Sequence, residues 1–390
     1  MSIPPILCVV GVSGSGKTHL LERVIPRLAA GGVRVAAVKH CGHVDGGPLH
    51  NDSHRLSRAG AAPAIADTGT DGEIRGAPRQ VLLLDLVWAF CRDCDLVLAE
   101  GYSRSVHDKI LLTSSKASGR PDVRRGRAPT YVGVRLVVGR RGVGQVGRDD
   151  TEAICRWIAG WLRHRRALRE GVTAAVLTGG ESRRMGRDKA GLRLAGRSML
   201  GMLCERLADR LGQVMIIGRR PASADVPLCA EWHPDDSPGL GPLGGIATAV
   251  RVAAATKPPQ AVCVVACDMP AVGSEVIDAL LEARHPQAGA PKREGPQSRY
   301  SGFGDPPSRL GTPPATVMVN PTTRRVEPLL GIYEPHALAA LQQALSRKRL
   351  SPTRWLLSAK AHCVRVGHKL ARQFRDVDTP DDLARARQKR

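Results

Sequence analysis

The chain has 390 residues, of which 42% are hydrophobic and only 3% aromatic, and its formal net charge is +22. This length is enough for two or three domains that each bury a core, and no run of 18 apolar residues predicts a membrane span. So few aromatic side chains leave little for base stacking, and Arg is spread along the chain, so we expect no nucleic-acid partner but a basic surface suited to nucleotides or phosphorylated cofactors.

The first predicted elements alternate between strands and helices. Ile6–Val10 is a short apolar run that predicts a strand; with no basic segment before it, we do not expect a signal peptide. A helix is expected from Lys17 to about Ala30, and a second strand at Val33–Lys39. Further strands are expected at "DLVLAEG", "KILLT" and "VGVRLVV", and "TEAICRWIAGWLRHRR" has helical spacing with a basic last turn. This alternation predicts a mostly parallel sheet.

The segment "GVSGSGKT" fits the phosphate-binding pattern G-x-x-x-x-G-K-[ST], and it stands between a strand and a helix as that pattern requires. Its glycines let backbone N–H groups converge on phosphate oxygens, and the helix N-terminus adds positive potential. We expect Lys17 to reach the β- and γ-phosphates and Thr18 to hold Mg²⁺. The predicted nucleotide-binding residues are Gly11, Ser13, Gly14, Ser15, Gly16, Lys17 and Thr18.

Two further groups of residues accompany this loop. Glu100, after the apolar run of "DLVLAEG", is the best candidate for a second Mg²⁺ ligand; the alternative is an ordinary surface acid. The stretch after the second strand offers phosphate or metal ligands, or else it is a solvated loop, and no metal is assigned to it. Its polar candidates are His40, His43, Asp45, Asp52 and Arg55.

The stretches "GVSGSGKTHLLERVIPRLAAGGVRVAAVKH", "DSHRLSRAGA" and "DLVLAEGY" resemble the molybdopterin-guanine dinucleotide biosynthesis adaptor family. The resemblance covers most of residues 5–165 and implies a small P-loop GTP-binding protein, with slow GTP hydrolysis as one reading. Its partners would be other molybdenum cofactor biosynthesis proteins and molybdoenzymes. Ser103 replaces the family's usual Lys, and "DGGPLHNDS" departs from its Pro-Gly-Lys-Asp-Ser run, which leaves the partner contacts of this loop open.

The ten cysteines show no disulfide pattern, which together with the absence of a secretion signal predicts a reducing cytoplasm. Cys91 and Cys94 form a single C-x-x-C pair. Without a second pair we do not expect a zinc site, and we expect both residues to lie on a helix as small apolar side chains.

A second alternating series follows a short joint at Ala167–Gly171, so we expect domains at 1–168 and 172–390. Strands are expected at "TAAVLTGG", "QVMIIG" and "AVCVVACDMP", and helices at "MLGMLCERLADRLG", closed by Gly212, and after "GPLGG". The Pro-, Gly- and Arg-rich stretch 285–314 predicts a flexible insertion. The last segment predicts a strand at "FRDV", a turn, and a helix with Thr379 as N-cap and Pro380 at its first position.

The segment "LTGGESRRMGRDKAGL" is a second glycine-rich loop of a different kind. Gly179 and Gly180 let the backbone approach a nucleotide, and Arg184 and Lys189 supply cations for a triphosphate cut between its α- and β-phosphates. Asp268 follows a strand, where ligands bind in open α/β sheets, and a carboxylate there can hold Mg²⁺. We therefore expect Lys189, Arg184 and Asp268 to be the catalytic residues.

Together, "LTGGESRRMGRDKAGL", "GPLGGI", "CDMP", "EPLLGIY" and "DVDTPDDL" resemble the molybdenum cofactor guanylyltransferase family over about 172–388. The resemblance implies a Rossmann-like nucleotidyltransferase of the nucleotide-diphospho-sugar transferase type, which transfers GMP from GTP to molybdopterin or Mo-molybdopterin and releases pyrophosphate. "IIGRR" departs from the family's Asn-containing strand end. By matching positions, the implied contacts are Leu177, Thr178, Gly179 and Asp235 to the nucleotide, Lys189 to its phosphates and Asp268 to Mg²⁺.

Three alternatives remain open from the sequence. The first is cytidylyl transfer to the same cofactor, although that family usually begins its loop with L-A-A-G where this chain has "LTGG". The second is a sugar-phosphate nucleotidyltransferase, whose loop begins similarly. The third is a non-catalytic, nucleotide-regulated protein that delivers the cofactor.

Overall fold

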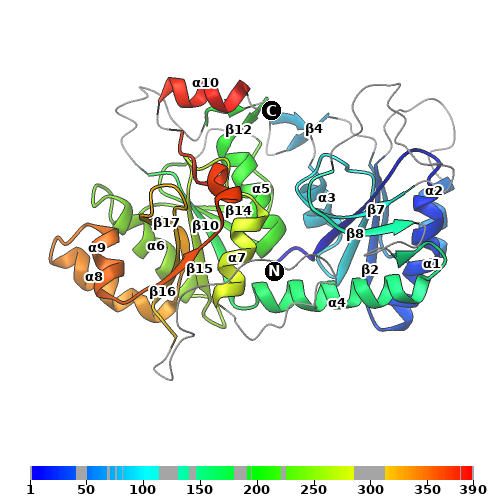
Figure 1. Cartoon of the computed structure of the whole chain (residues 1–390), viewed down its shortest axis with the longest axis horizontal. Helices are drawn as coiled ribbons and strands as arrows, with labels where there is room; N and C mark the ends of the chain where they lie inside the picture. The colour runs from blue at the N-terminus through cyan, green and yellow to red at the C-terminus, as the bar shows by residue number, and fades with distance from the viewer. Residues whose placement is uncertain are drawn as a thin grey trace. The chain divides into compact units, whose positions relative to one another are not determined.

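The structure is a computed structural model that forms two compact units, drawn in Figure 1. The division falls between Arg165 and Arg166, inside helix α4 (Thr151–Arg169), so the joint predicted at Ala167–Gly171 is helical as far as Arg169. Each unit is treated by itself. The residues that the structure describes are 2–40, 51–67, 71–74, 77–80, 82–113, 131–139, 146–179, 191–194, 196–220, 225–284, 312–377 and 379–388.

The first unit contains a seven-stranded parallel sheet in the order β3-β2-β6-β1-β7-β8-β9. Parallel strands need crossover connections, which the predicted βα alternation supplies. Its strands are β1 (Ile6–Val10), β2 (Val35–His40), β3 (Ala64–Asp67), β6 (Leu96–Glu100), β7 (Asp108–Leu112), β8 (Val134–Gly139) and β9 (Val146–Gly147), with a separate hairpin of β4 (Asp71–Ile74) and β5 (Ala77–Gln80). Its other helices are α1 (Lys17–Ala30), α2 (Asn51–Arg58) and α3 (Leu83–Phe90).

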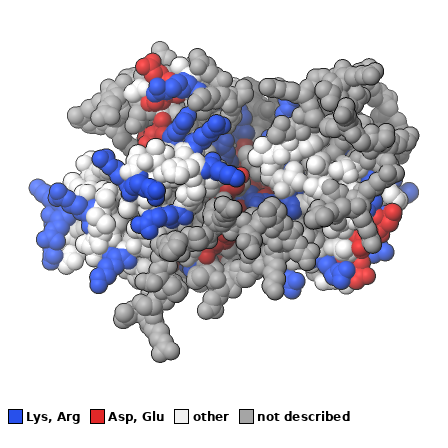
Figure 2. All heavy atoms as spheres, viewed as in Figure 1, with Lys and Arg blue, Asp and Glu red and all other residues white. Residues whose placement is uncertain are grey.

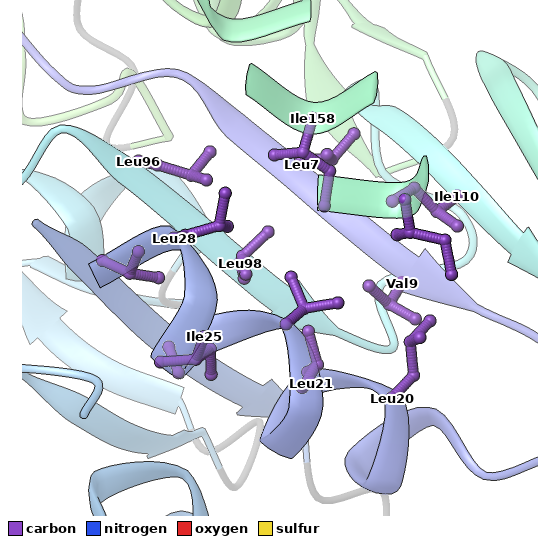
Figure 3. Close-up of a cluster of buried hydrophobic side chains, with 14 of the residues drawn as sticks. Leu7, Val9, Leu20, Leu21, Ile25, Leu28, Leu96, Leu98, Ile110 and Ile158 are labelled. Atoms are coloured by element: carbon purple, nitrogen blue, oxygen red, sulfur yellow. The ribbon is translucent and has the colours of Figure 1, made fainter. Parts of the chain in front are cut away.

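One face of this sheet is covered by α1 and α4 (Figure 3). Leu7 and Val9 alternate along β1, as do Leu96 and Leu98 along β6, so that each pair points to the same side. Helix α1 presents its buried residues at the three- and four-residue spacing of an amphipathic helix, and Ile158 of α4 joins them. The residues that α1 buries are Leu20, Leu21, Val24, Ile25 and Leu28.

The second unit contains a seven-stranded sheet in the order β14-β13-β10-β15-β17-β16-β18, and β17 is its only antiparallel strand. A mostly parallel sheet in each half is therefore confirmed. The strands are β10 (Val172–Leu177), β13 (Val214–Ile217), β14 (Ala230–His233), β15 (Ala261–Ala266), β16 (Ala315–Val319), β17 (Val326–Tyr333) and β18 (His362–Arg365), with a small hairpin of β11 (Arg193–Leu194) and β12 (Arg197–Ser198).

Helices lie on both faces of the second sheet (Figure 1). The face that carries Ala175, Leu177, Val262 and Val264 packs against α6 (Pro242–Ala254), α8 (Leu338–Ser346) and α9 (Pro352–Ser358). Helices α5 and α7 pack on the other side and contact each other. The remaining elements of this unit are α5 (Met199–Leu211), α7 (Ser274–Arg284), α10 (Pro380–Gln388) and the 3₁₀ helices η2 (Pro335–Ala337) and η3 (His368–Phe374).

Strand β17 carries a bulge against β16. Val317 pairs with Gly331, whereas the next residue, Met318, pairs with Glu327, so Pro328–Leu330 bulge out of that pairing. Pro328 has no N–H to donate to a ladder, and its carbonyl accepts a 2.6 Å hydrogen bond from the buried Tyr333 hydroxyl. The bulge is thus anchored by a side chain of its own strand.

Substituting Ala for Gly331 is expected to destabilise the second unit by more than about 2 kcal/mol. A Cβ at this position would lie 2.4 Å from Val317 Cγ1 and 2.9 Å from the Thr316 carbonyl oxygen, which is backbone and cannot turn away. Gly160→Ala on α4 is the matched control, because a Cβ there meets nothing within 4 Å and Ala favours a helix. Urea unfolding measures both, and equal stability of the two variants would contradict the steric argument.

Several local predictions are settled by the structure. Gly212 closes α5 in the left-handed conformation with φ 82°, and Thr379 and Asp382 exchange the hydrogen bonds of a capping box at the start of α10, as expected. The strand predicted at "FRDV" is wrong: η3 runs to Phe374, and the residues after it are irregular. The helical placement of Cys91 and Cys94 is also wrong, since α3 ends at Phe90 and the pair lies in the following turn. Of the predicted insertion, 285–311 lies outside the described residues.

Basic side chains are unevenly placed. Figure 2 shows Lys and Arg gathered over the α8–α9 end of the second unit, where the exposed cations are Arg347, Lys348, Arg349, Arg354 and Lys360. From Pro335 to Arg375 the sequence contains no Asp or Glu to balance them. No helix in the described ranges is long and apolar enough to cross a membrane.

Candidate functional site

The glycine-rich loop after β1 has a backbone that requires glycine at several positions. Gly14 and Gly16 have φ of 70° and 84°, in the left-handed region, and Gly16 is the N-cap of α1. A Cβ on Gly11 would lie 2.4 Å from the Leu112 carbonyl oxygen at the end of β7. The loop is therefore wound tightly between strand and helix, as the phosphate-binding pattern predicts.

The chemistry-bearing side chains of this loop meet at the carboxyl edge of the first sheet. Thr18 donates a 2.8 Å hydrogen bond from Oγ1 to Oε2 of the buried Glu100, at the end of β6. Lys17 Nζ donates to the carbonyl oxygens of Val12 and Gly11 at 3.0 and 3.3 Å, and burial lowers its pKa. The structure thus brings together Thr18 and Glu100, two oxygen donors of the kind Mg²⁺ prefers.

The same edge holds polar residues that the sequence did not single out. Lys39 Nζ lies 3.5 Å from Glu100 Oε1, and the Tyr102 hydroxyl bonds to Asp67. His40, one of the candidates named from sequence, lies with Nδ1 3.5 Å from Asp67 Oδ2 and with its ring 5.1 Å from that of Tyr102. Lys39 and His40 lie at the end of β2, Asp67 ends β3, and Tyr102 follows β6. Sequence motifs did not reveal that the ends of these parallel strands bring the four residues to one edge.

The other candidates of this region separate from the loop or are not described. Arg55 forms a two-pronged ion pair with Glu22 of α1 at 2.6 and 2.7 Å, so it ties α2 to α1. His43 and Asp45 lie outside the described residues, as does the side chain of Asp52. Burial raises the pKa of Cys91 to about 12, and also raises that of Cys94, which suits inert thiols; no group of metal-binding side chains occurs among the described residues.

The second glycine-rich loop begins where β10 ends. Thr178 is buried and its hydroxyl donates to the carbonyl oxygens of Ile217 and Arg219 at 3.0 and 2.8 Å, while Gly179 is exposed. A Cβ on Gly218, whose φ is 108°, would lie 3.1 Å from the Gly179 amide nitrogen. The ends of β10 and β13 are therefore held together, with the Gly179 backbone presented at the surface.

The side chain of Leu177 packs in the core and does not lie at the surface. Its side chain is buried against Gly245 of α6, where a Cβ would approach to 3.2 Å, and its carbonyl accepts from Cys267 N at 3.1 Å. Its predicted nucleotide contact remains a prediction. Gly180, Arg184 and Lys189 lie outside the described residues.

Asp235 and Asp236 have different environments at the entry to α6. Asp235 Oδ1 accepts from Ser237 N at 2.9 Å and from the Thr248 hydroxyl at 3.0 Å, so the first carboxylate orders the loop before the helix. Asp236 forms an ion pair with Arg251 on the outside of α6. Asp235 is therefore bonded both to the loop before α6 and to Thr248 within that helix.

Asp268 lies just beyond the carboxyl end of β15, next to the end of β10. Leu177 pairs with Ala266 in the parallel register, so the segments that begin with Thr178 and with Cys267 leave the sheet at the same edge. The turn after Asp268 is held from two sides: Val377 N donates to its carbonyl at 2.8 Å, and Arg206 of α5 donates to the carbonyl of Val272 at 3.1 Å. The second loop and this carboxylate thus share one edge of the sheet.

A second acid belongs to this edge and was missed by the sequence. Glu327 starts the antiparallel β17, so it lies at the edge where β15 and β16 end. Its Oε1 accepts a 2.9 Å hydrogen bond from Nδ2 of the buried Asn320, whose own carbonyl oxygen accepts from the amides of Thr322 and Thr323. Burial raises the pKa of Glu327, and the nearby Asp268 carboxylate raises it further.

The raised pKa makes a pH-dependent prediction for Glu327→Gln. Because the folded-state pKa lies above the ordinary value of 4.5, ionised Glu327 opposes folding, and wild-type stability falls relative to the variant as pH rises from 4.5 through the folded-state pKa. In EDTA, we expect the variant to melt about 2 °C higher than wild type near pH 8, and the difference to vanish near pH 4.5. Melting curves across this range check it; a variant less stable at every pH would contradict it.

Comparison with known proteins finds a matching family model in each half. The family described as "Molybdopterin guanine dinucleotide synthesis protein B" matches residues 6–129, and the "MobA-like NTP transferase domain" matches residues 174–364. The first match contains the Gly11–Thr18 loop and Glu100, and the second contains Thr178, Gly179 and Asp268. Two α/β domains, one of the P-loop type and one of the nucleotidyltransferase type, are therefore confirmed.

Curated relatives carry the same two descriptions. The molybdopterin-guanine dinucleotide biosynthesis adapter proteins of Escherichia coli and Haemophilus influenzae are 34% and 41% identical over 123 and 113 residues, which are 70% and 62% of those proteins and 30% and 28% of this chain. The molybdenum cofactor guanylyltransferase of Xanthomonas euvesicatoria is 39% identical over 110 residues, 28% of this chain. The chain spans 53% of the length of this last relative.

Proposed function

We propose that this chain, which belongs to the molybdopterin-guanine dinucleotide synthesis protein B family in its first unit and carries a MobA-like NTP transferase domain in its second, is a bifunctional protein of molybdenum cofactor biosynthesis. The second unit transfers GMP from GTP to the terminal phosphate of molybdopterin or Mo-molybdopterin. The first unit binds GTP and acts as an adaptor. Such a protein works in the cytoplasm, where its nucleotide substrate is found.

The observation that carries this proposal is the pairing of β10 with β15. It supports the proposal because the segments that carry Gly179 and Asp268 leave the sheet at the same carboxyl edge, where ligands bind in open α/β folds. Asp235 lies at the same edge, after β14 and before α6. A triphosphate laid along this edge would have a backbone cradle on one strand and a carboxylate for Mg²⁺ on the next.

The residues of this edge fit a hard cation. Asp268 supplies carboxylate oxygens, and Glu327 adds a second acid held by Asn320. When bound, Mg²⁺ would neutralise charge on the triphosphate. Asp268 would hold the ion in place, while Lys189 and Arg184, by their sequence positions, would bind the phosphates that leave.

The transfer needs alignment more than a strong base. An anionic oxygen of the acceptor's terminal phosphate attacks the α-phosphorus of GTP and forms a new P–O bond. The bond from the α-phosphorus to the bridging oxygen of the β-phosphate breaks, and pyrophosphate leaves with that electron pair. Because the attacking oxygen is already ionised at neutral pH, the protein's task is to position the two phosphates and offset their charge.

In the first unit, the contact of Thr18 with Glu100 and the cation of Lys17 support GTP binding with Mg²⁺. Thr18 and Glu100 would offer their side-chain oxygens to a Mg²⁺ ion bound together with the phosphates of GTP. We propose other cofactor biosynthesis proteins and molybdoenzymes as partners of this unit.

A nucleotide-choice assay tests the transferase proposal. The full chain is incubated with molybdopterin, Mg²⁺ and either GTP or CTP, and released pyrophosphate is measured. We expect release with GTP and little with CTP. A preference for CTP would make the second unit a cytidylyltransferase, and release with neither nucleotide would contradict the transferase proposal.

A further inference from the structure

Arg148 reaches the phosphate-binding loop from a distant part of the first unit. It lies in the turn between β9 and α4, outside residues 6–129 matched by the adaptor family. Its Nη2 donates to the carbonyl oxygen of Ser15 at 2.6 Å and to that of Thr113, just after β7, at 2.5 Å. One guanidinium nitrogen therefore bridges the middle of the loop and the neighbouring strand end.

The bond to Ser15 sets the direction of a loop amide. In a trans peptide the C=O and the following N–H point in opposite directions, so the carbonyl that faces Arg148 aims the N–H of Gly16 the other way. Gly16 is the N-cap of α1, and its N–H donates no hydrogen bond to the residues that the structure describes. An N–H at this place is one of those that a phosphate-binding loop offers its ligand.

Arg148 also brings a charge that its surroundings do not cancel. Within the described part of the chain it forms no ion pair with an acid, and the adjacent Asp149 lies 3.5 Å from Arg23 instead. Its buried Nε has no hydrogen-bond partner among the described residues, and neither does the buried Oγ of Ser15. Ser15 is only 3% exposed. The loop thus has an uncompensated cation behind it and an unused hydroxyl within it.

We propose that Arg148 is a positioning residue of the first nucleotide site, which fixes the phosphate-binding loop in its anion-binding form and adds a fixed positive charge behind it. This inference rests on the proposed GTP binding of the first unit. It places part of the site in the segment that leads into α4, which the matched family region does not contain. The ligand class is a nucleoside triphosphate, or any phosphate that the loop accepts.

The test compares binding of a fluorescent methylanthraniloyl-GTP to the full chain and its variants in the presence of Mg²⁺. Because the second unit is itself proposed to bind GTP, first-unit binding is the part of the signal that Lys17→Ala removes. Arg148→Ala should weaken binding by about tenfold, the loss expected when charge-assisted hydrogen bonds that order the loop are removed. Arg148→Lys keeps the charge and a donor, and should return affinity to within about threefold of wild type. Arg156→Ala is the matched control, because its side chain is 73% exposed on α4, the helix that follows Arg148, and lies 4.0 Å from Glu152.

Each outcome separates this inference from the function it rests on. If Lys17→Ala loses the first-unit binding while Arg148→Ala keeps it, Arg148 has no positioning role and the GTP site stands. If Lys17→Ala binds as much fluorescent GTP as wild type does, the proposed GTP binding of the first unit is wrong and the inference falls with it. Melting curves without nucleotide accompany each titration. Equal weakening by Ala and Lys, with a lower melting temperature in both, would show a purely structural role and overturn the inference.

Discussion

Replacing Asp268 by Asn or Ala is expected to lower nucleotidyl transfer by about 10³-fold, while the protein stays folded. The bond from Val377 N that holds the turn goes to the backbone carbonyl of Asp268, which any substitution keeps. The substitution removes the carboxylate proposed for Mg²⁺. Pyrophosphate release with molybdopterin and GTP measures the effect, and far-UV circular dichroism checks the fold.

Glu231→Gln is the control for Asp268. It removes one carboxylate from the same unit, at a side chain that is 69% exposed and lies 3.9 Å from His233 Nε2. We expect its activity to equal that of wild type. Normal turnover by purified Asp268→Ala would refute the assignment of Asp268, whereas equal losses in both variants would point to a general effect of charge.

Replacing Lys17 by Ala is expected to weaken GTP binding at the first unit by about 10²-fold and to leave transfer by the second unit unchanged. In the structure the ammonium group is satisfied by the carbonyls of Gly11 and Val12, which it would exchange for phosphate oxygens. Because burial already lowers its pKa, the group is poised to gain from a nearby anion.

Titration with fluorescent GTP and the pyrophosphate assay on one preparation separate the two effects of Lys17→Ala. Arg27→Ala removes a positive charge from the exposed far end of the same helix and should change neither. Loss of transfer in Lys17→Ala would show that the first unit is required by the second, contrary to the independence expected here.

The fold was largely predictable because its signals are local. Apolar runs alternate with helical spacing in both halves, and glycine motifs mark where β1 and β10 end. The errors fell where tertiary contacts decide: "FRDV" has strand-like residues, yet its order comes from burial of Phe374 and Val377 and from the bond of Val377 N to the Asp268 carbonyl, not from pairing with a sheet. Cys91 and Cys94 were wrongly predicted to be helical because α3 ends at Phe90, before both residues.

The candidate sites were predictable where a residue belongs to a glycine-rich motif or directly follows an apolar strand. Thr18 and Glu100 were both named from sequence, and the structure joins them at 2.8 Å. Glu327 and Asn320 were missed because no spacing links them to Asp268; an antiparallel strand returns them to the same edge. Arg148 was missed for the same reason, since 133 positions separate it from Ser15.

The bulge in β17 divides the β16–β17 hairpin into two parts, and we expect substitutions in one part to have little effect on the other. Below it, Thr316 and Val317 pair with Ile332 and Gly331 inside the core; above it, Met318 pairs with Glu327 and the hairpin closes. Because Pro328–Leu330 are not paired with β16, we expect exchanges of core residues in the first part to leave the direction of Glu327 unchanged. Conversely, the hairpin end can be re-sculpted for a different acceptor without shifting the core, so this end is where we expect relatives to diverge in length while keeping the sheet.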